Sequence, residues 1–471
     1  MLPKSDLINT FEGIDYYSTI SNNTIELSNI ISKSQVKYSY NYLLDMWHGK
    51  NVNFTESKKS LHYSCRLFFN QTFQKSIIID KSIDTELTNM LSLANDIRSG
   101  KFGNISDIIH IGAGGSHLGP KLIYNCFKHR LRTPKVHFIS NADPSSLSNV
   151  LHSLNPLKTL VFTVSKSFKT NETILNLKRV KAWLIKSKLP SKKISTRIIA
   201  ITSNPTAARH HELLSTNILL FNDHIGGRFS IWSAANLLTP TLFGVEFYVN
   251  FLRGGNIIDK HVYDKFDLSL PFLLAKRSYF SRLVKDEQSH CIIPYSQELN
   301  ILPYYLQQLI MESNGKSIDI NSSNVKSPCS NIFGYVGTDA QHSFFQSLHQ
   351  SSLKTSIDFI AFKNTYDNMN MIDKELDAQA FELLLNSCLS QYESFSNGNM
   401  NEKLINPHKL VKGNKSVNLL LFEKLSEFTL GKIICLYEYK TIMEASLSKI
   451  NPFDQFGVEV GKKIINKKDN S

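Results

Sequence analysis

Short β-rich runs alternate with longer segments of helical periodicity from about residue 105 onward, and this alternation constrains the fold more than any other feature of the chain. Each run ends at a small or polar residue, and helical segments at 118–130 and 173–187 lie between runs. Strand–loop–helix repetition of this kind predicts a parallel sheet with helices on its faces. The runs are 108–111, 136–140, 160–165 and 198–202.

A second set of the same kind follows, with strands expected at 291–294 and 357–362, a helix ending at Glu312 and a helix at 374–389. The expected fold class is α/β, with two doubly wound units whose sheets are mainly parallel. The expected parts are a mainly helical N-terminal extension (1–59), two α/β domains (60–245 and 246–430) and a C-terminal helical segment (431–471). Smaller expectations are a polar surface excursion at 391–415, a helical stretch at 418–449 and a last helix at about 454–466.

Composition agrees with two domains, because 471 residues exceed what one hydrophobic core usually holds. The six cysteines are scattered without a CxxC pair, which indicates free thiols in a reducing compartment. The chain has no run of eighteen apolar residues, and its first residues resemble neither a signal peptide nor a transit peptide. We therefore expect a soluble, cytoplasmic protein with no membrane partner.

The formal charge is +13, from 53 basic and 40 acidic residues. Nucleic-acid-binding proteins concentrate Lys and Arg on one face, often with aromatic residues between them. Here Lys is spread along the chain, and the densest groups, at 192–193 and 462–468, are short. We therefore expect no nucleic-acid partner, although a basic chain also attracts small anionic substrates.

The segment MESNGK at 311–316 places a single carboxylate, Glu312, at the end of an apolar helical stretch. Apolar residues of 302–310 fall at helical spacing, and Asn-Gly should end the helix because both residues tolerate a left-handed backbone. Glu312 then lies in the last turn, where the negative end of the helix dipole disfavours an ionised carboxylate. It is a candidate general base, although a solvated helix-end Glu would show the same local pattern.

Two loops each follow an expected strand and open a helix. The loop IGAGGSHLG at 111–119 offers free backbone N–H groups to an anion, but it is not the dinucleotide fingerprint, because His117 stands at the third Gly position. An ordinary tight turn is the alternative. The loop SKSFKTNET at 165–173 combines hydroxyl groups, ammonium groups and helix N–H donors, which together suit a phosphate dianion.

Three further segments carry single polar candidates. Arg228 follows a diglycine and could stabilise an oxyanion, and His342 could move a proton during ring opening. Gln455 and Lys462 lie seven residues apart, on one face of the expected last helix. Each has a structural alternative: an Arg bonded to backbone carbonyls, a hydrogen-bonded core histidine, and a Lys462–Glu459 pair on a solvated face.

Taken together, these segments resemble the glucose-6-phosphate isomerase (phosphoglucose isomerase) family. The family patterns are close to GIGGSxLGP, SKTFTTxET, GGRYSxWS, MESNGK, GTxGQHxFxQxxHQ and SFDQxGVELGK. The chain shows GAGGSHLGP, SKSFKTNET, GGRFSIWS, MESNGK, GTDAQHSFFQSLHQ and PFDQFGVEVGK in the same order, over about 110–463, and a further NPHK…GN stretch at 406–414. Six segments in register are far more specific than any one of them.

The resemblance implies two sugar-isomerase (SIS) domains that interconvert glucose 6-phosphate and fructose 6-phosphate without a metal or an organic cofactor. By motif position, Glu312 would move a proton between C2 and C1, and Arg228 would stabilise the cis-enediolate. His342 and Lys462 would assist ring opening, with the histidine supplied by the neighbouring subunit of a homodimer. Ser165, Lys166, Ser167 and Thr170 would hold the phosphate, and Gly115, Ser116, Gln308 and Gln455 would contact the sugar or orient Glu312.

Several positions depart from the family patterns without removing a predicted catalytic group. His117 replaces Asp, Lys169 replaces Thr, and Asp339-Ala340 replaces Asn-Gly before Gln-His. These changes bear on the fine geometry of the site more than on the reaction class. Two alternatives stay open: an isomerase that also accepts mannose 6-phosphate, and a non-catalytic sugar-phosphate sensor built on the same domains.

Overall fold

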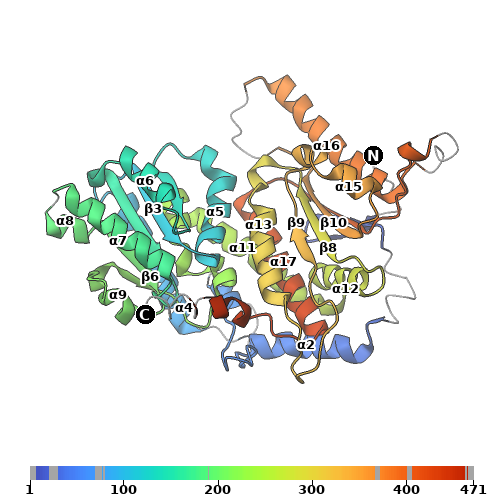
Figure 1. The fold of residues 1–471 in the computed structure, drawn as a ribbon, viewed down its shortest axis with the longest axis horizontal. Coiled ribbons are helices and arrows are strands. Elements are labelled where there is room, and N and C mark those ends of the chain that lie inside the picture. The colour runs from blue at the N-terminus through green and yellow to red at the C-terminus, as the bar shows by residue number, and fades with distance from the viewer. Residues whose placement is uncertain are drawn as a thin grey trace.

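The computed structural model describes residues 7–20, 30–68, 77, 80–188, 190–365, 372–399, 406–461 and 464. Two sheets lie side by side with helices on their faces, and the long helices α11 (Val245–Lys265) and α17 (Glu427–Leu447) lie between them (Figure 1). This arrangement confirms the expected fold class of two α/β units with parallel-rich sheets. The limits of the domains stay a prediction.

The first sheet is parallel and has the strand order β4-β3-β5-β6-β7. Its strands are β3 (Asp107–Gly112), β4 (Lys135–Ile139), β5 (Thr159–Val164), β6 (Ile198–Thr202) and β7 (Ile218–Leu220). The four strands expected here are confirmed, and β7 adds a short edge strand. The strand order reverses at β3, which pairs with both β4 and β5, and such sheets bind ligands beyond the strands' carboxyl ends at this point.

Alternate side chains of the first sheet pack on opposite faces, as the two-residue period of a strand requires. Ile109 and Ile111 of β3 join a cluster with Leu177, whereas Ile108 joins the central core with Leu122. The helices around this sheet are α4 (Lys81–Arg98), α5 (Gly115–Phe127), α6 (Pro144–Ser153), α7 (Asn171–Lys186), α8 (Ser191–Ser195) and α9 (Pro205–Arg209). Both faces of the sheet are therefore covered.

The second sheet has the order β1-β2-β11-β10-β8-β9 and is parallel from β11 to β9. Its strands are β1 (Leu7–Phe11), β2 (Ile14–Ser18), β8 (Ser289–Pro294), β9 (Asn331–Phe333), β10 (Thr355–Phe362) and β11 (Val417–Phe422). The helices around it include α13 (Leu302–Asn314), α14 (Gly337–Gln341), α15 (Phe345–Gln350) and α16 (Lys374–Asn397). The hairpin β1–β2 adds antiparallel strands at the edge next to β11.

Further helices fill the space around α11 and α17. They are α2 (Lys33–Trp47), α3 (His62–Leu67), α10 (Leu238–Phe243) and α12 (Leu270–Leu283). The 3-10 helices are η2 (Lys128–Arg130), η3 (Pro156–Lys158), η4 (Ser215–Asn217), η5 (Gly227–Trp232), η6 (Ala234–Asn236), η7 (Phe266–Leu268), η8 (Gln297–Leu299), η10 (Pro407–Lys409) and η11 (Phe456–Val458).

The expected mainly helical N-terminal extension contains α2 and also the hairpin β1–β2. One expectation about an individual element needs correction. The stretch 418–449 is not all helix: it begins as strand β11, since a short, mostly apolar run fits a buried strand as well as a buried helix, and Ser426 then caps α17. Within the expected last helix, 456–458 form the 3-10 helix η11, and the described residues 459–461 and 464 are α-helical.

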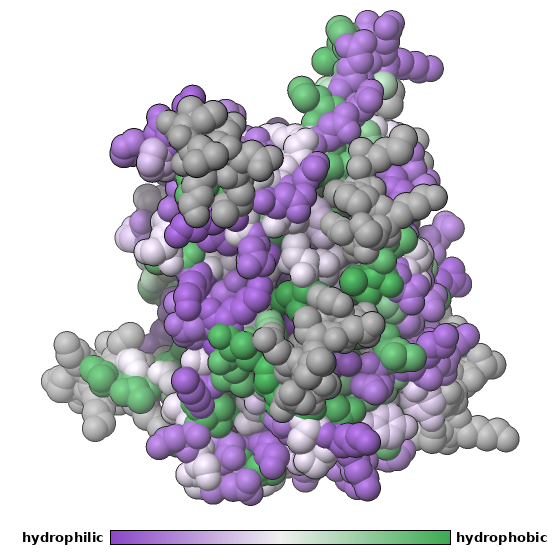
Figure 2. Space-filling model, turned by 90° about the vertical axis from the view of Figure 1, so that its right-hand side faces the viewer, coloured by the Kyte–Doolittle hydropathy of each residue, from purple (hydrophilic) through white to green (hydrophobic). Residues whose placement is uncertain are grey.

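The face of the molecule at the right of Figure 1 carries many hydrophilic residues, and hydrophobic residues gather near its centre (Figure 2). Helix α16 rises above the body in both views, and Leu376 and Leu383 on its first half are exposed. The polar excursion expected at 391–415 begins inside α16, and 400–405 lie outside the described residues. Among the helices that the structure describes, none combines the length and the apolar character that crossing a membrane requires.

The helices α11 and α17 approach each other backbone to backbone. A Cβ atom added at Gly254 would lie 1.9 Å from the carbonyl oxygen of Phe428, and one added at Gly431 would lie 2.2 Å from that of Phe251. Both distances are far below van der Waals contact. Glycine at both positions is therefore required for the packing between the two sheets.

We expect Gly254→Ala to destabilise the protein by about 1–3 kcal/mol, because overpacking a close contact forces the helices apart. The measurement is thermal unfolding followed by circular dichroism. Gly461→Ala is the control, since a Cβ there meets no atom within 4 Å. Equal midpoints for Gly254→Ala and the wild type would show that α11 and α17 do not pack this closely.

Candidate active site

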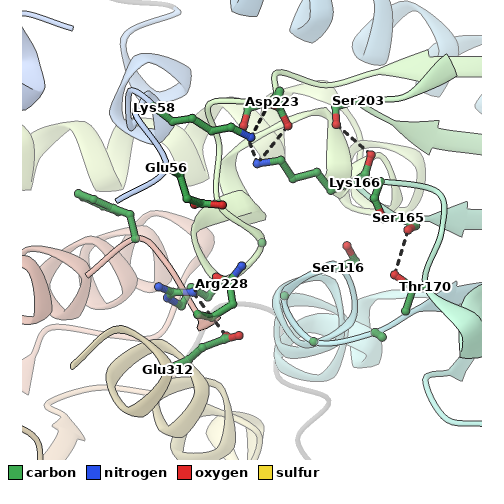
Figure 3. Close-up of a pocket in the computed structure, with 18 of the residues that line it drawn as sticks. Glu56, Lys58, Ser116, Ser165, Lys166, Thr170, Ser203, Asp223, Arg228 and Glu312 are labelled. Atoms are coloured by element: carbon green, nitrogen blue, oxygen red, sulfur yellow. Dashed lines mark hydrogen bonds and ion pairs between the residues drawn. The ribbon is translucent and has the colours of Figure 1, made fainter. Parts of the chain in front are cut away.

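A cavity of about 720 Å³ lies beyond the carboxyl ends of β3 and β5, at the point where the strand order reverses. Segments far apart in the sequence form its walls, and their polar side chains point into it (Figure 3). The lining residues come from 53–60, 113–116, 164–173, 203–204, 223–228, 308–312 and 453–459. The loops that the sequence marked at 111–119 and 165–173 therefore lie together.

The loop after β3 depends on two glycines. Gly114 has a φ of 55°, in the left-handed region that favours glycine. A Cβ at Gly115 would lie 1.9 Å from the carbonyl oxygen of Gly227, so only glycine lets the first turn of α5 touch the start of η5. Gly115 and Ser116 consequently line the cavity beside Arg228.

The loop after β5 gathers hydroxyl groups at the start of α7. Ser165 Oγ lies 3.3 Å from Thr170 Oγ1 and accepts a hydrogen bond from the backbone N–H of Phe168. Ser167 Oγ accepts one from the N–H of Lys169, while Thr170 precedes α7 without capping it through its side chain. Three hydroxyl groups at the positive end of a sixteen-residue helix suit a phosphate group.

The two lysines of this loop behave differently. Lys166 lines the cavity, but its ammonium group donates to the carbonyl oxygens of Asp223 and Ile225 and lies 3.4 Å from the Asp223 carboxylate. Burial lowers the pKa of Lys166, and Asp223 opposes that shift. Lys169 is exposed and is not among the lining residues, so this departure from the family pattern faces solvent.

Glu312 lies in the last turn of α13, as predicted. Gln308, one turn earlier, donates a 2.9 Å hydrogen bond from Nε2 to Glu312 Oε2, and Arg228 Nη1 lies 3.7 Å from the same oxygen. The helix ends at Asn314, but not by the expected left-handed residue, because Gly315 has a φ of −72°. Glycine is needed there for space instead, since a Cβ at Gly315 would lie 2.4 Å from the carbonyl oxygen of Met311.

The guanidinium of Arg228 is buried and fully engaged. Its Nε donates to Ser313 Oγ at 2.7 Å, Nη1 donates to Gln455 Oε1 at 2.8 Å, and Nη2 donates to the carbonyl oxygens of Pro452 and Asp454. Burial lowers the pKa of Arg228 and Glu312 raises it, but a guanidinium stays protonated in proteins. Arg228 is therefore a fixed cation beside the Glu312 carboxylate.

Lys316, which the sequence analysis did not single out, ties the end of α13 to the C-terminal segment. Its ammonium group donates to the carbonyl oxygens of Glu312, Ser313 and Asp454 and forms an ion pair with the Asp454 side chain at 3.2 Å. A cation at a helix C-terminus satisfies free carbonyl groups there. The motif MESNGK contained this residue, but its sequence gave no sign of the contact with Asp454.

The segment 53–60 is a second part of the site that sequence reasoning missed. Asn53 and Lys58 pair across a tight turn in which Ser57 has a φ of 53°. This turn brings Glu56 and Lys58 to the cavity (Figure 3). Thr55 donates to the Asp454 carboxylate at 2.5 Å, a contact across almost the whole chain that no local pattern could reveal.

Of the expected catalytic residues, one does not line this cavity and one lies outside the described residues. His342 is exposed after α14 and does not line the cavity, whereas His224 does. Lys462 lies outside the described residues, although Glu459, on the same segment, lines the cavity. In the part of the chain that the structure describes, no group of three or more His, Cys, Asp or Glu side chains could hold a metal ion.

The fold and the cavity define an α/β protein that places one carboxylate beside a buried cation and offers an anion site at a helix N-terminus. The family model for phosphoglucose isomerase matches residues 17–471. The chain is 35% identical to glucose-6-phosphate isomerase of Paraburkholderia xenovorans, over 88% of this chain and 78% of that protein, and 34% identical to that of Buchnera aphidicola subsp. Cinara cedri, over 95% and 84%. It is also similar to the crystal structure of a glucose-6-phosphate isomerase from Chlamydia trachomatis, with a TM-score of 0.85 and 28% identity over 98% of this chain and 89% of that one. The chain belongs to the phosphoglucose isomerase family.

His117, which replaces the family's usual Asp, is buried in the first turn of α5 near a second histidine. Its ring packs edge-on against Phe138 with centroids 5.5 Å apart. Burial, with His110 and Lys121 nearby, lowers the pKa of His117 to about 3, and burial lowers that of His110 to about 4. Both rings are neutral at neutral pH, and His110 Nε2 donates to the carbonyl oxygen of Ser116 at 2.8 Å, which supports the cavity loop.

These buried histidines predict a loss of stability in mild acid. Their pKa values in the folded protein lie below the ordinary value of 6.5, so the unfolded chain binds protons first as the pH falls from about 6.5 to 4. His117→Asn should make the free energy of unfolding less steep in this window, by up to about 1.4 kcal/mol per pH unit. Urea unfolding at pH 7, 6 and 5 measures the slope, with exposed His48→Asn as control. An unchanged slope would mean that His117 is not buried as a neutral ring.

Proposed function

We propose that this protein interconverts glucose 6-phosphate and fructose 6-phosphate, the activity for which its curated relatives are named. The observation that carries this proposal is the Glu312 carboxylate, held by Gln308 and 3.7 Å from the buried Arg228 guanidinium. Aldose–ketose isomerisation needs this combination: one base that removes and returns a proton, and one cation near the oxygen that gains charge.

In the proposed mechanism, Glu312 removes the proton from C2 of the open-chain aldose and returns it to C1. The cis-enediolate formed in between carries negative charge on oxygen, and Arg228 stabilises that charge. The hydrogen bonds from Arg228 to Ser313 and Gln455 exist before substrate binds, so the cation needs no reorganisation when charge develops. Gln308 fixes the direction of the Glu312 carboxylate.

The phosphate group is proposed to bind at the start of α7, through Ser165, Ser167 and Thr170, with Lys166 nearby. Binding energy from this distant group can then position C1 and C2 against Glu312. In Figure 3, Ser165 and Thr170 lie across the cavity from Glu312, and Ser116 lies between them. This separation supports the assignment of Gly115, Ser116, Gln308 and Gln455 to the sugar portion.

Ring opening requires a group that moves a proton between the ring oxygen and the anomeric hydroxyl. We propose His342 and Lys462 for this step, with His342 supplied by the second subunit of a homodimer. The exposed position of His342, away from the cavity of its own chain, supports a contribution across a subunit interface. We also propose a cytoplasmic location, which the six free cysteines support because thiols persist in reducing compartments.

Glu312→Gln should lower turnover by about 10²–10⁴, the usual contribution of a general base, with little change in affinity for the phosphate group. The assay follows formation of glucose 6-phosphate from fructose 6-phosphate by its NADP-dependent oxidation. The matched control is Glu393→Gln, which removes an exposed carboxylate near the end of α16.

Near-normal turnover of Glu312→Gln would assign the base role to another residue. A wild-type protein that binds the sugar phosphate but does not turn it over would instead be a sensor, and the proposed reaction would be wrong.

Subunit sharing predicts complementation between two inactive variants. In a heterodimer of Glu312→Gln and His342→Ala, one site keeps both residues, so random mixing should restore about a quarter of wild-type activity if the dimer is symmetric. The two variants are unfolded together, refolded and assayed, with each variant refolded alone as control. Activity that stays at the level of the single variants would mean that His342 does not act across an interface.

A further inference from the structure

The carboxylate of Asp223 lies between two ammonium groups at the wall of the cavity. Its Oδ2 lies 2.8 Å from Lys58 Nζ and its Oδ1 lies 3.4 Å from Lys166 Nζ (Figure 3). Lys58 comes from the N-terminal turn and Lys166 from the loop after β5, so Asp223 joins two segments that the sequence separates by more than one hundred residues. The family resemblance assigned neither Lys58 nor Asp223 a role.

The backbone of Lys166 is fixed, and its ammonium group is bound by Asp223 and Ile225 instead of by the hydroxyl groups of its own loop. The carbonyl oxygen of Lys166 accepts hydrogen bonds from Thr202 Oγ1 and from the N–H and hydroxyl of Ser203. This holds the residue between the hydroxyl groups of Ser165 and Ser167. Its ammonium group turns away from them, toward the carboxylate and backbone carbonyl of Asp223.

We propose that Asp223 is a positioning residue that binds the Lys166 ammonium before substrate arrives. The substrate phosphate then competes with Asp223 for this ammonium and binds it instead. The proposal rests on the proposed function, since it takes the phosphate to bind beside Ser165 and Thr170. Asp223 then sets the affinity for the phosphate group and leaves the proton transfer at Glu312 unaffected.

The surroundings make this exchange feasible. A phosphate dianion is a stronger partner for an ammonium group than a carboxylate, because it carries more charge and more acceptor oxygens. Asp223 would not be left without a counter-charge, because Lys58 stays at 2.8 Å. Burial lowers the pKa of Lys166, and Asp223 opposes that shift.

The test is a double-mutant cycle of Asp223→Asn and Lys166→Met, assayed with fructose 6-phosphate. Asp223→Asn should lower KM about two- to fivefold at unchanged kcat, the range expected for loss of a half-exposed ion pair. Lys166→Met should raise KM, and Asp223→Asn should then have no further effect in the Lys166→Met background. Asp45→Asn, which removes an exposed carboxylate paired with Lys50, is the control.

Either of two results would overturn the proposal. A higher KM for Asp223→Asn would mean that Asp223 holds Lys166 where it already serves the phosphate. If Asp223→Asn lowers KM equally in the wild type and in the Lys166→Met variant, Asp223 acts on the phosphate directly through its negative charge and not through Lys166.

Isothermal titration calorimetry with inorganic phosphate compares the phosphate affinity of the wild type and of Asp223→Asn without the need for turnover. We expect Asp223→Asn to bind phosphate more tightly. If the wild type lacks isomerase activity, the proposed reaction fails while the phosphate measurement still decides whether Asp223 restrains Lys166.

Discussion

The buried guanidinium of Arg228 is the interaction on which the site depends. A buried charge is costly unless its hydrogen bonds are satisfied and an opposite charge lies nearby. The partners of Arg228 come from α13 and from the C-terminal segment, up to 227 residues away in the sequence. Satisfying one cation therefore fixes η5, the end of α13 and the segment 452–455 relative to one another, and the same contacts place Glu312 beside the charge.

Helix dipoles divide the cavity into two ends with different chemistry. The N-termini of α5 and α7 open into it from the first sheet, and the C-terminal turn of α13 enters it with Glu312. The positive ends of α5 and α7 favour an anion, whereas the end of α13 presents its carboxylate beside the Arg228 guanidinium. The close contact of Gly115 with Gly227 places the start of α5 against η5, which carries Arg228. This division is consistent with the proposed placement of the substrate phosphate at α7 and of C1 and C2 at Glu312.

The sequence predicted those elements of the fold that depend mainly on neighbouring residues. The strands β3 to β6 and the position of Glu312 follow from periodicity, and the reversal at β3 explains why two distant loops meet. Strand β11 was expected to be helical because only its neighbours β10 and β2 decide its state. Two features depend on contacts between segments that are far apart in the sequence, so no local motif predicts them. They are the placement of the turn that carries Glu56 and the pairing of Lys166 with Asp223.

The cavity also bears on which histidine can open the sugar ring. His224 lines it, but burial lowers the pKa of its ring, and the nearby lysines add to this effect while Asp223 opposes it. The ring oxygen is bonded to C1 in the aldose and to C2 in the ketose, so the group that protonates it must lie near the carbons that Glu312 is proposed to serve. His224 belongs to the wall of Asp223 and Lys166, which is not the wall of Glu312 and Arg228. His224 therefore does not suit this step, which is consistent with the proposal that His342 and Lys462 serve it.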